Sequence, residues 1–178
     1  MTTLSIRPAA PADIPAVAAI YSHAVLHGTA SWEIEPPDEA EMLRRFEAVQ
    51  AGGYPYLVAT RDGELLGYAY AGAYRPRPAY RATVENSIYI APTAQGLGIG
   101  GLLLDELMTA CTERGFRQMI AVIGDGTGAS LGSRRLHEKA GFRLIGVAEK
   151  VGFKHGRWLD QMLMQKELGE GDRAPPAF

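Results

Sequence analysis

A run of glycines in the middle of the chain could bind a phosphate group. Four glycines fall within six positions, between an apolar strand-like run and an apolar helix-like run: Gly96, Gly98, Gly100 and Gly101. Glycine lets backbone N–H groups approach an anion closely, and the first turn of a helix leaves such groups unpaired. The run has two spellings. Gly96, Gly98 and Gly101 form the dinucleotide fingerprint GxGxxG, whereas Gln95, Gly98 and Gly100 form QxxGxG.

The dinucleotide interpretation has one supporting feature and three objections. Asp125 follows the second strand of a strand–loop–helix–strand unit, near where an acidic ribose ligand is expected. Residues 91–95, however, separate the first strand from the first glycine. That strand also carries Glu85, Asn86 and Ser87, which a strand buried on both faces would not hold unpaired. Too little chain follows for a doubly wound sheet.

The glycines have two simpler interpretations. A nucleoside triphosphate loop is excluded, because no Lys-Ser/Thr pair follows the glycines. A glycine-rich turn without function stays open, although each glycine in a helix costs roughly 1 kcal/mol relative to alanine.

Apolar periodicity predicts the elements that must position this loop. Strands are expected at residues 4–7, 56–60, 65–73, 82–90, 116–123, 142–151 and 158–168, and helices at 11–26, 38–50, 98–114 and 134–140. Asp62-Gly63 predicts a hairpin between the second and third strands. The helix at 98–114 is expected to bury five residues: Leu102, Leu103, Leu107, Met108 and Cys111. The strand at 116–123 is expected to be a central parallel strand.

This order of elements predicts an α/β fold, a mixed sheet with helices on both faces. A single domain is expected over residues 1–168, followed by a disordered tail at 169–178. The net charge of −2 and the absence of a basic block argue against a nucleic-acid or membrane-surface protein. The single cysteine, Cys111, excludes an internal disulfide and favours a reducing compartment. With no signal-peptide pattern and no membrane-length apolar run, a cytoplasmic location is expected.

The QxxGxG loop, one short step after a glutamate-bearing strand, resembles the pyrophosphate loop of the GNAT acetyltransferases. The resemblance covers about residues 4–168 and is most specific in the segments RPRPAY, VENSIY and GFKHGRW. Within that family, the chain most resembles the phosphinothricin and methionine sulfoximine/sulfone N-acetyltransferases, which acetylate the α-amino group of small amino acids. The resemblance implies a GNAT fold, acetyl-CoA as cosubstrate, no metal and a homodimer.

The resemblance also implies a binding site for the cofactor. Backbone amides of the loop would bind the diphosphate: Gln95, Gly96, Leu97, Gly98, Ile99, Gly100 and Gly101. The backbone of Ile88, Tyr89 and Ile90 would pair with the pantetheine arm like an added strand. In one place the chain departs from the family pattern. The family usually has Asn-x-x-Ser before the LHE helix, whereas this chain has Ser130 at the asparagine's offset and Ser133 at the serine's spacing.

Two residues are candidates for proton transfer, since acetylation requires a neutral amine and a protonated leaving thiolate. Glu85 matches the family's general base, acting directly or through a water. The alternative is a strand glutamate that is solvated or paired with Arg81. His137 lies where many GNAT proteins have a tyrosine that protonates the thiolate, and histidine donates a proton near neutral pH. The alternative is a helix histidine that bonds locally or packs on the cofactor.

The acceptor would be bound by several separate segments. Arg75 and Arg77 flank Pro76, and their guanidinium groups suit the substrate carboxylate, with the proline in the wall of the site. Solvated loop arginines are the alternative. Glu85, Asn86 and Ser87 would face the amino end, and Trp32 would cover the side chain unless it belongs to the core. Lys154 lies with His155 and Trp158 on a closing hairpin that, in the resembling enzymes, approaches the site across a two-fold dimer.

Two other patterns are better explained by structure than by chemistry. His23 and His27 have helical spacing, but no third metal ligand is evident. Cys111 lies on the buried stripe of its helix, which suits a structural cysteine better than an acyl-enzyme nucleophile.

The sequence therefore predicts a homodimeric enzyme that transfers acetyl groups directly to a small amino acid. A protein N-terminal or polyamine acetyltransferase and a non-catalytic acetyl-CoA-binding module are the alternatives.

Overall fold

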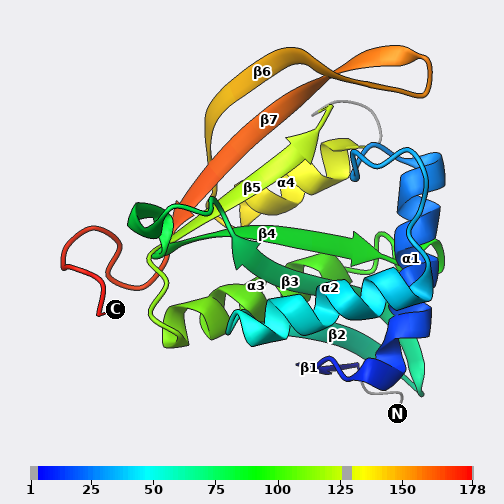
Figure 1. The fold of residues 1–178 in the computed structure, drawn as a ribbon, viewed down its shortest axis with the longest axis horizontal. Helices are drawn as coiled ribbons and strands as arrows, with labels where there is room; N and C mark the ends of the chain where they lie inside the picture. The colour runs from blue at the N-terminus through cyan, green and yellow to red at the C-terminus, as the bar shows by residue number, and fades with distance from the viewer. Residues whose placement is uncertain (1–3, 126–129, 178) are drawn as a thin grey trace.

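The computed structural model describes residues 4–125 and 130–177. Within these residues, seven strands form one sheet in the order β1-β2-β3-β4-β5-β7-β6 (Figure 1). The strands are β1 (Ser5–Pro8), β2 (Tyr56–Arg61), β3 (Glu64–Ala73), β4 (Thr83–Ile90), β5 (Gln118–Gly124), β6 (Arg143–Lys154) and β7 (Arg157–Glu167). The α-helices are α1 (Ile14–His27), α2 (Glu39–Ala51), α3 (Ile99–Glu113) and α4 (Leu131–Lys139). Each corresponds to a predicted element, and the mixed α/β fold is confirmed.

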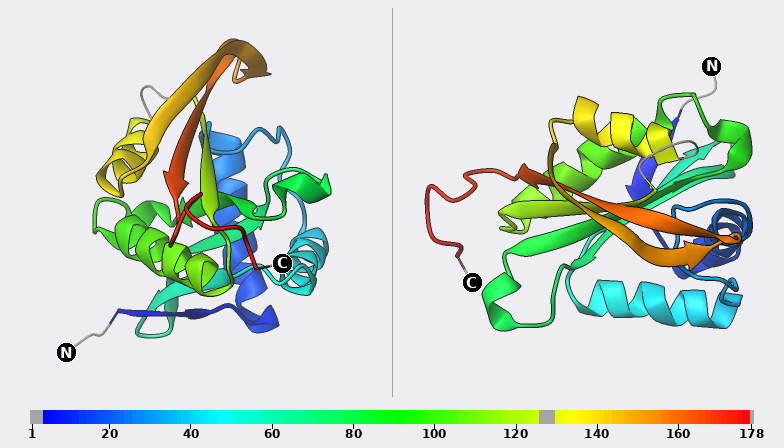
Figure 2. Two further views of the ribbon diagram at one scale, coloured as in Figure 1. Left: turned by 90° about the vertical axis from the view of Figure 1, so that its left-hand side faces the viewer. Right: turned by 90° about the horizontal axis from the view of Figure 1, so that it is seen from above.

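The helices cover both faces of the sheet, as expected. α1 and α2 lie on one face, and α3 and α4 lie on the other (Figure 2). β4 and β5 form a parallel pair, from Thr83 opposite Gln118 to Asn86 opposite Ala121. The other strand pairs recorded for the described residues are antiparallel. β5 is therefore central, but it is parallel to only one of its neighbours.

Local signals account for several boundaries. Asp38 caps α2 by accepting a hydrogen bond from the backbone N–H of Glu41 at 2.8 Å. Asp62 and Gly63 both adopt positive φ between β2 and β3, as a two-residue hairpin turn requires. The first predicted helix begins with a 3-10 turn at Pro11–Asp13 before α1 starts. α4 begins three residues earlier than predicted, at Leu131 rather than Arg134.

One prediction about α3 is wrong. Leu102 is 48% exposed, whereas Leu104, which periodicity does not select, is fully buried. The buried stripe runs through Leu103, Leu107 and Cys111, and Leu104 lies one turn before Leu107 and Met108 on this face. In a run of three leucines the periodicity identifies the helix, but which leucine faces outward depends on how the helix is rotated against the sheet.

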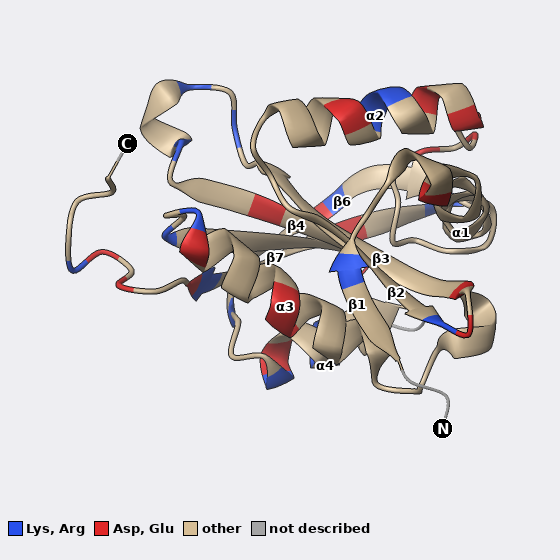
Figure 3. Cartoon of the chain, turned by 90° about the horizontal axis from the view of Figure 1, so that it is seen from below, with Lys and Arg blue, Asp and Glu red and all other residues tan. Residues whose placement is uncertain are grey.

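The charged residues are distributed in agreement with the near-neutral net charge. Acidic and basic residues occur together on α2 and at the ends of several strands (Figure 3). In the described part of the chain, no helix combines the length and the hydropathy needed to cross a membrane. Residues 169–177 form turns without helix or strand, and Glu170 pairs with Arg117 at 2.9 Å. The division into a domain and a disordered tail stays a prediction.

Candidate active site

A cleft opens where the parallel pair β4–β5 separates. Pairing between the two strands ends at Asn86 and Ala121, while β4 continues to Ile90 and β5 to Gly124. The cleft has a volume of about 980 Å³. Its walls come from the end of α1, the segment 28–33, β4, the glycine loop and the start of α4. The predicted cofactor segments and the predicted base therefore share one cavity.

The glycine loop forms one end of this cleft. Gly98 is the N-cap of the 15-residue helix α3, with φ of +79°, and Gly96 has φ of +78°. A Cβ on either residue would meet no other atom within 4 Å, so the space beside both is open. Unpaired N–H groups at a helix N-terminus, together with the helix dipole, favour an anion there. The loop therefore fits a diphosphate.

Two residues of the predicted loop differ from expectation. The N–H of Gly101 already donates to the carbonyl of Gly98 at 3.1 Å, which leaves the diphosphate to the earlier amides. Leu97 is 57% exposed and is not part of the cleft wall. Gln95, Gly96, Gly98, Ile99, Gly100 and Gly101 all line the cleft, as do Ile88, Tyr89 and Ile90.

Glu85 and Ser87 point to the face of the sheet covered by α1 and α2. They lie opposite Gly72 and Tyr70 of β3. Side chains alternate along a strand, so Asn86 points to the other face. It is buried there, next to His137 of α4. The expectation that all three residues face the amino end of the substrate therefore does not hold for Asn86.

The environment of Glu85 suits a base. Burial raises the pKa of the Glu85 carboxyl, and the guanidinium of Arg75 lowers it in part. Arg75 is thus a cation that acts on Glu85, and the pairing with Arg81 suggested by the sequence stays an alternative. Because Gly72 has no side chain, it leaves open the position across from Glu85 on β3.

His137 is held on both sides. Its Nδ1 donates to the carbonyl of Ser133 at 2.8 Å, and its Nε2 lies 3.2 Å from the side-chain oxygen Oδ1 of Asn86. Burial lowers the pKa of His137, so the ring is neutral with its one proton on Nδ1. In the structure the oxygen of the Asn86 amide faces Nε2, and turning the amide by 180° would let its NH₂ group donate to Nε2 of the neutral ring. This arrangement favours the alternative of a locally bonded histidine, and the general-acid role stays a prediction.

The segment 28–33, which we call the acceptor loop, is fixed by three other parts of the chain. The Thr29 and Ser130 hydroxyl groups are buried and 2.7 Å apart, which joins the loop to the start of α4. Ser130, which occupies the position where the family usually has an asparagine, thus bonds to this loop. From the other side, His155 on the turn between β6 and β7 lies 3.0 Å from the carbonyl of Gly28. Residues 127–129, which belong to the segment that differs from the family pattern, lie outside the described residues.

Lys154 also fixes the acceptor loop. The Lys154 ammonium is buried and donates to the carbonyl of Ser31 at 2.7 Å. Burial lowers the pKa of Lys154, and nearby Glu33 raises it in part. Lys154 is not part of the cleft wall. The prediction that it binds substrate is therefore not supported within one chain, because its ammonium is engaged by the loop backbone.

Trp32 packs against two glycines, one on β6 and one on β5. A Cβ on Gly152 of β6 would lie 1.8 Å from the Trp32 ring, and one on Gly124 of β5 would lie 3.5 Å from it. The ring lines the cleft. Both predicted roles, a cover for the substrate and a packed aromatic, are compatible with this position.

The arginine segment lies outside the cleft wall. Arg75, Pro76 and Arg77 are all exposed. The Arg75 guanidinium lies 5.1 Å from the centre of the Tyr74 ring, a cation–π distance. Its effect on Glu85 indicates that it is within electrostatic reach of the base.

Sequence reasoning missed several residues around the cleft. Tyr21 and Glu33 line it, Tyr70 is within electrostatic reach of Glu85, and Arg45 bonds to Glu33. Alternation along β3 could have identified Tyr70, but nothing local pairs Glu33 with Arg45.

The remaining candidates have structural explanations. His23 and His27 lie at the cleft with ring centres 4.6 Å apart. Across residues 4–125 and 130–177, no group of three His, Cys, Asp or Glu could hold a metal. Cys111 is buried, which raises the pKa of its thiol to about 12. Asp125, the ribose ligand of the dinucleotide interpretation, forms an ion pair with Arg157.

Comparisons with known proteins agree with this site. Residues 17–142 match the Acetyltransferase (GNAT) family. The chain is 54% identical to a phosphinothricin N-acetyltransferase of Alcaligenes faecalis over 165 residues, which cover 92% of this chain and 82% of the relative. It is 42% identical to an L-methionine sulfoximine/L-methionine sulfone acetyltransferase of Pseudomonas paraeruginosa, covering 96% and 98%.

A solved structure has the same fold and contains the cofactor. It is a GNAT superfamily phosphinothricin acetyltransferase from Sinorhizobium meliloti in complex with AcCoA. It is 50% identical to this chain with a TM-score of 0.94, and the match covers 98% of this chain and 94% of that one. A splayed parallel pair, an anion-binding helix N-terminus and these relatives lead to one conclusion: the chain belongs to the GNAT acetyltransferase family.

Proposed function

We propose that this protein transfers the acetyl group of acetyl-CoA to the α-amino group of a small amino acid. The observation that carries the proposal is the position of Glu85. It lines the same cleft as the open N-terminus of α3, on the face of β4 that α1 and α2 enclose. Phosphinothricin, methionine sulfoximine and methionine sulfone are the leading acceptors, since the relatives are named for them.

The cleft is suited to acetyl-CoA. The amides from Gly96 to Gly100 would bind the diphosphate at the helix N-terminus. The backbone of Ile88 to Ile90 would pair with the pantetheine arm, because β4 loses its partner β5 beyond Asn86. Ser130 and Ser133 line the same cavity at the start of α4. The thioester would then lie beside the face that carries Glu85.

The chemistry is a direct transfer between two bound substrates. The acceptor arrives as an ammonium ion, and Glu85 removes a proton, directly or through a water. The amine nitrogen then forms a bond to the acetyl carbon, and the carbon–sulfur bond breaks. The nitrogen releases a second proton, the thiolate gains one, and coenzyme A leaves as a thiol. Arg75 and Arg77 would bind the acceptor carboxylate, with Pro76 between them and Trp32 over the side chain.

Two copies of the chain would form the active protein. The hairpin of β6 and β7 extends from one edge of the domain (Figure 1). Several of its large apolar side chains are exposed. Trp158 is 61% exposed and Phe153 is 56% exposed, and their rings are in contact. A contiguous exposed apolar surface commonly marks a protein interface. A cytoplasmic location and the absence of nucleic-acid or membrane partners remain predictions.

A polyamine or protein N-terminal acetyltransferase is the second candidate. Arg75 and Arg77 argue against it, because two guanidinium groups would repel a polycation. The test is release of the coenzyme A thiol from acetyl-CoA with each acceptor added separately. We expect turnover with at least one of the three amino acids and none with spermidine. Turnover with spermidine or peptides alone would favour the rival, and acetyl-CoA binding without turnover would indicate a non-catalytic module.

A further inference from the structure

The cleft contains a second carboxylate besides Glu85. Glu33, on the acceptor loop, lines the same cavity. Burial is the largest cause of the raised pKa of Tyr70, and both Glu85 and Glu33 raise it further. Glu33 and Glu85 therefore lie in one cavity, with Tyr70 within electrostatic reach of both.

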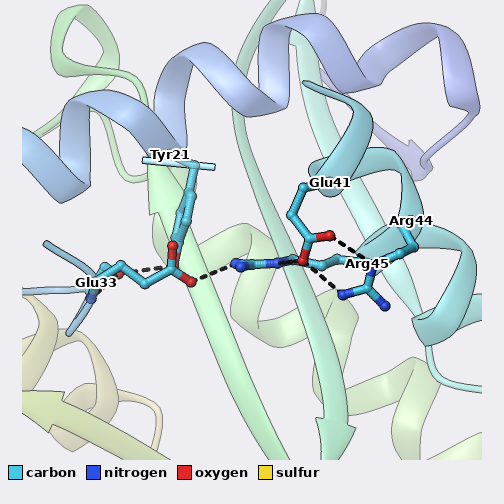
Figure 4. A network of polar contacts seen from close by, with 6 residues as sticks. Tyr21, Glu33, Glu41, Arg44 and Arg45 are labelled. Carbon is cyan, nitrogen blue, oxygen red and sulfur yellow. Dashed lines mark hydrogen bonds and ion pairs between the residues drawn. The ribbon is translucent and has the colours of Figure 1, made fainter. Parts of the chain in front are cut away.

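Glu33 is held in place by an arginine of α2. The Nη1 of Arg45 on α2 donates to Glu33 Oε1 at 2.6 Å, and the Arg45 Nε donates to Glu41 at 2.8 Å. Figure 4 shows Arg45 between the two carboxylates, with Tyr21 beside Glu33. A carboxylate has about four lone-pair sites on two oxygens. The bond to Arg45 therefore leaves Glu33 able to accept a further donor.

Holding the acceptor loop does not require this ion pair. The loop is already bonded to Lys154 through Ser31 and to Ser130 through Thr29, and Trp32 is packed on Gly152. The side chains of Arg45 and Glu33 are 39% and 33% exposed. An ion pair with this much contact with solvent contributes little to stability. A role toward the occupant of the cleft explains its position better.

We propose that Glu33 binds the α-ammonium group of the incoming amino acid. This inference rests on the proposed function and adds an acceptor-binding residue to it. The ammonium group has three N–H donors. Glu85 takes one proton, while Glu33 accepts a hydrogen bond from another and so orients the nitrogen. Arg45 is then a positioning residue that keeps the Glu33 carboxylate directed into the cleft.

The first test is Glu33→Gln. Glutamine has the same shape and keeps an oxygen for Arg45, but it loses the negative charge. A charge-assisted hydrogen bond of this kind corresponds to about a 10- to 100-fold effect on binding, so the KM for the acceptor should rise by about that factor. The KM for acetyl-CoA should not change. Glu35→Gln is the matched control, since Glu35 is exposed two residues further along and is outside the cleft.

The second test separates ammonium binding from loop holding. It uses an analogue of the acceptor that lacks the α-amino group as a competitive inhibitor. For methionine sulfone this analogue is 4-(methylsulfonyl)butanoic acid. We expect the same inhibition constant for the wild-type protein and for the Glu33→Gln variant, because the analogue has no ammonium group. A parallel rise in the inhibition constant and the acceptor KM would assign Glu33 to loop structure and overturn the inference.

The outcomes also separate this inference from the proposed function. An unchanged acceptor KM in Glu33→Gln, with the original protein active on amino acids, would overturn only the role of Glu33. No turnover of any amino acid by the original protein would overturn the proposed function, and the inference with it.

Discussion

The two halves of the cleft are built in different ways. The cofactor half comes from one continuous stretch, in which β4 leads through the glycine loop into α3. The acceptor half combines the loop at 28–33, the arginine segment at 75–77 and side chains from α1, α2 and β3. In the first half, backbone amides would do the proposed binding, and their direction follows from local conformation. In the second, side chains would do it, and the position of each depends on contacts made by distant residues.

The largest expected effect comes where the two halves meet. Glu85→Gln removes the base while keeping the shape of the side chain, so kcat should fall by about 10²-fold or more. Steady-state kinetics with acetyl-CoA and the best acceptor would measure this loss. Glu64→Gln, at the exposed start of β3, is the control and should leave kcat unchanged. A Glu85→Gln variant with full kcat would show that the cleft contains a different base.

A second prediction concerns a variant that should disturb only the acceptor half of the cleft. In Gly152→Ala the new methyl group would overlap the Trp32 ring, whose nearest atom lies 1.8 Å from the Cβ position. Overpacking of this kind costs about 1–3 kcal/mol, which denaturant unfolding would detect. Gly146→Ala is the control on the same strand, since no atom lies within 4 Å of its Cβ position. Equal stability of the two variants would contradict the packing described for Trp32.

A third prediction concerns a variant that should disturb only the cofactor half of the cleft. Gly98→Ala introduces a side chain at a φ of +79°, directly at the helix N-terminus. Gly53→Ala is a control for backbone strain, because Gly53 has a φ of +77° and is outside the cleft. Strain at either position costs about 1–2 kcal/mol of stability. Only Gly98→Ala should raise the KM for acetyl-CoA, several-fold, and an equal effect of both variants would exclude a local role for the loop.

The smallest expected effect is a shift in the pH dependence of activity, which would test the electrostatic interaction between Arg75 and Glu85. A base must be deprotonated, so kcat/KM should fall as the pH drops through the raised pKa of Glu85. Arg75 lowers that pKa, and in Arg75→Gln the acid limb of the pH profile should move to higher pH. Arg77→Gln removes a charge from the same segment and should leave the limb in place. A limb that does not move in Arg75→Gln would mean that Glu85 does not control it.

Much of the fold could be predicted because its signals are local. Asp38, the Asp62-Gly63 pair and the apolar stripes define caps, turns and helices over a few residues. One error arises where a local pattern has more than one three-dimensional solution. Leu102 is expected in the core because periodicity identifies a helix without its exact rotation. Asn86 is expected beside Glu85 because the motif is considered as a unit, although alternation along a strand places Asn86 on the face opposite Glu85 and Ser87.

The acceptor side was harder to predict because its contacts join distant parts of the chain. Lys154 bonds to Ser31 across 123 residues, and His137 faces Asn86 across 51. Both are ionisable residues that a motif marks as candidates for chemistry. Their buried hydrogen bonds give them a structural explanation that the motif does not contain.

The sequence alone determined the family resemblance, the order of the elements, the glycine loop before a helix and the choice of Glu85 as the proposed base. These follow from backbone geometry, which depends on residue types a few positions apart. The tertiary structure decided that His137 bonds to Asn86, that Lys154 fixes the acceptor loop and that Glu33 lines the cleft while bonded to Arg45. A side chain's role depends on what it meets when the chain packs, and burial then sets both its hydrogen bonds and its charge.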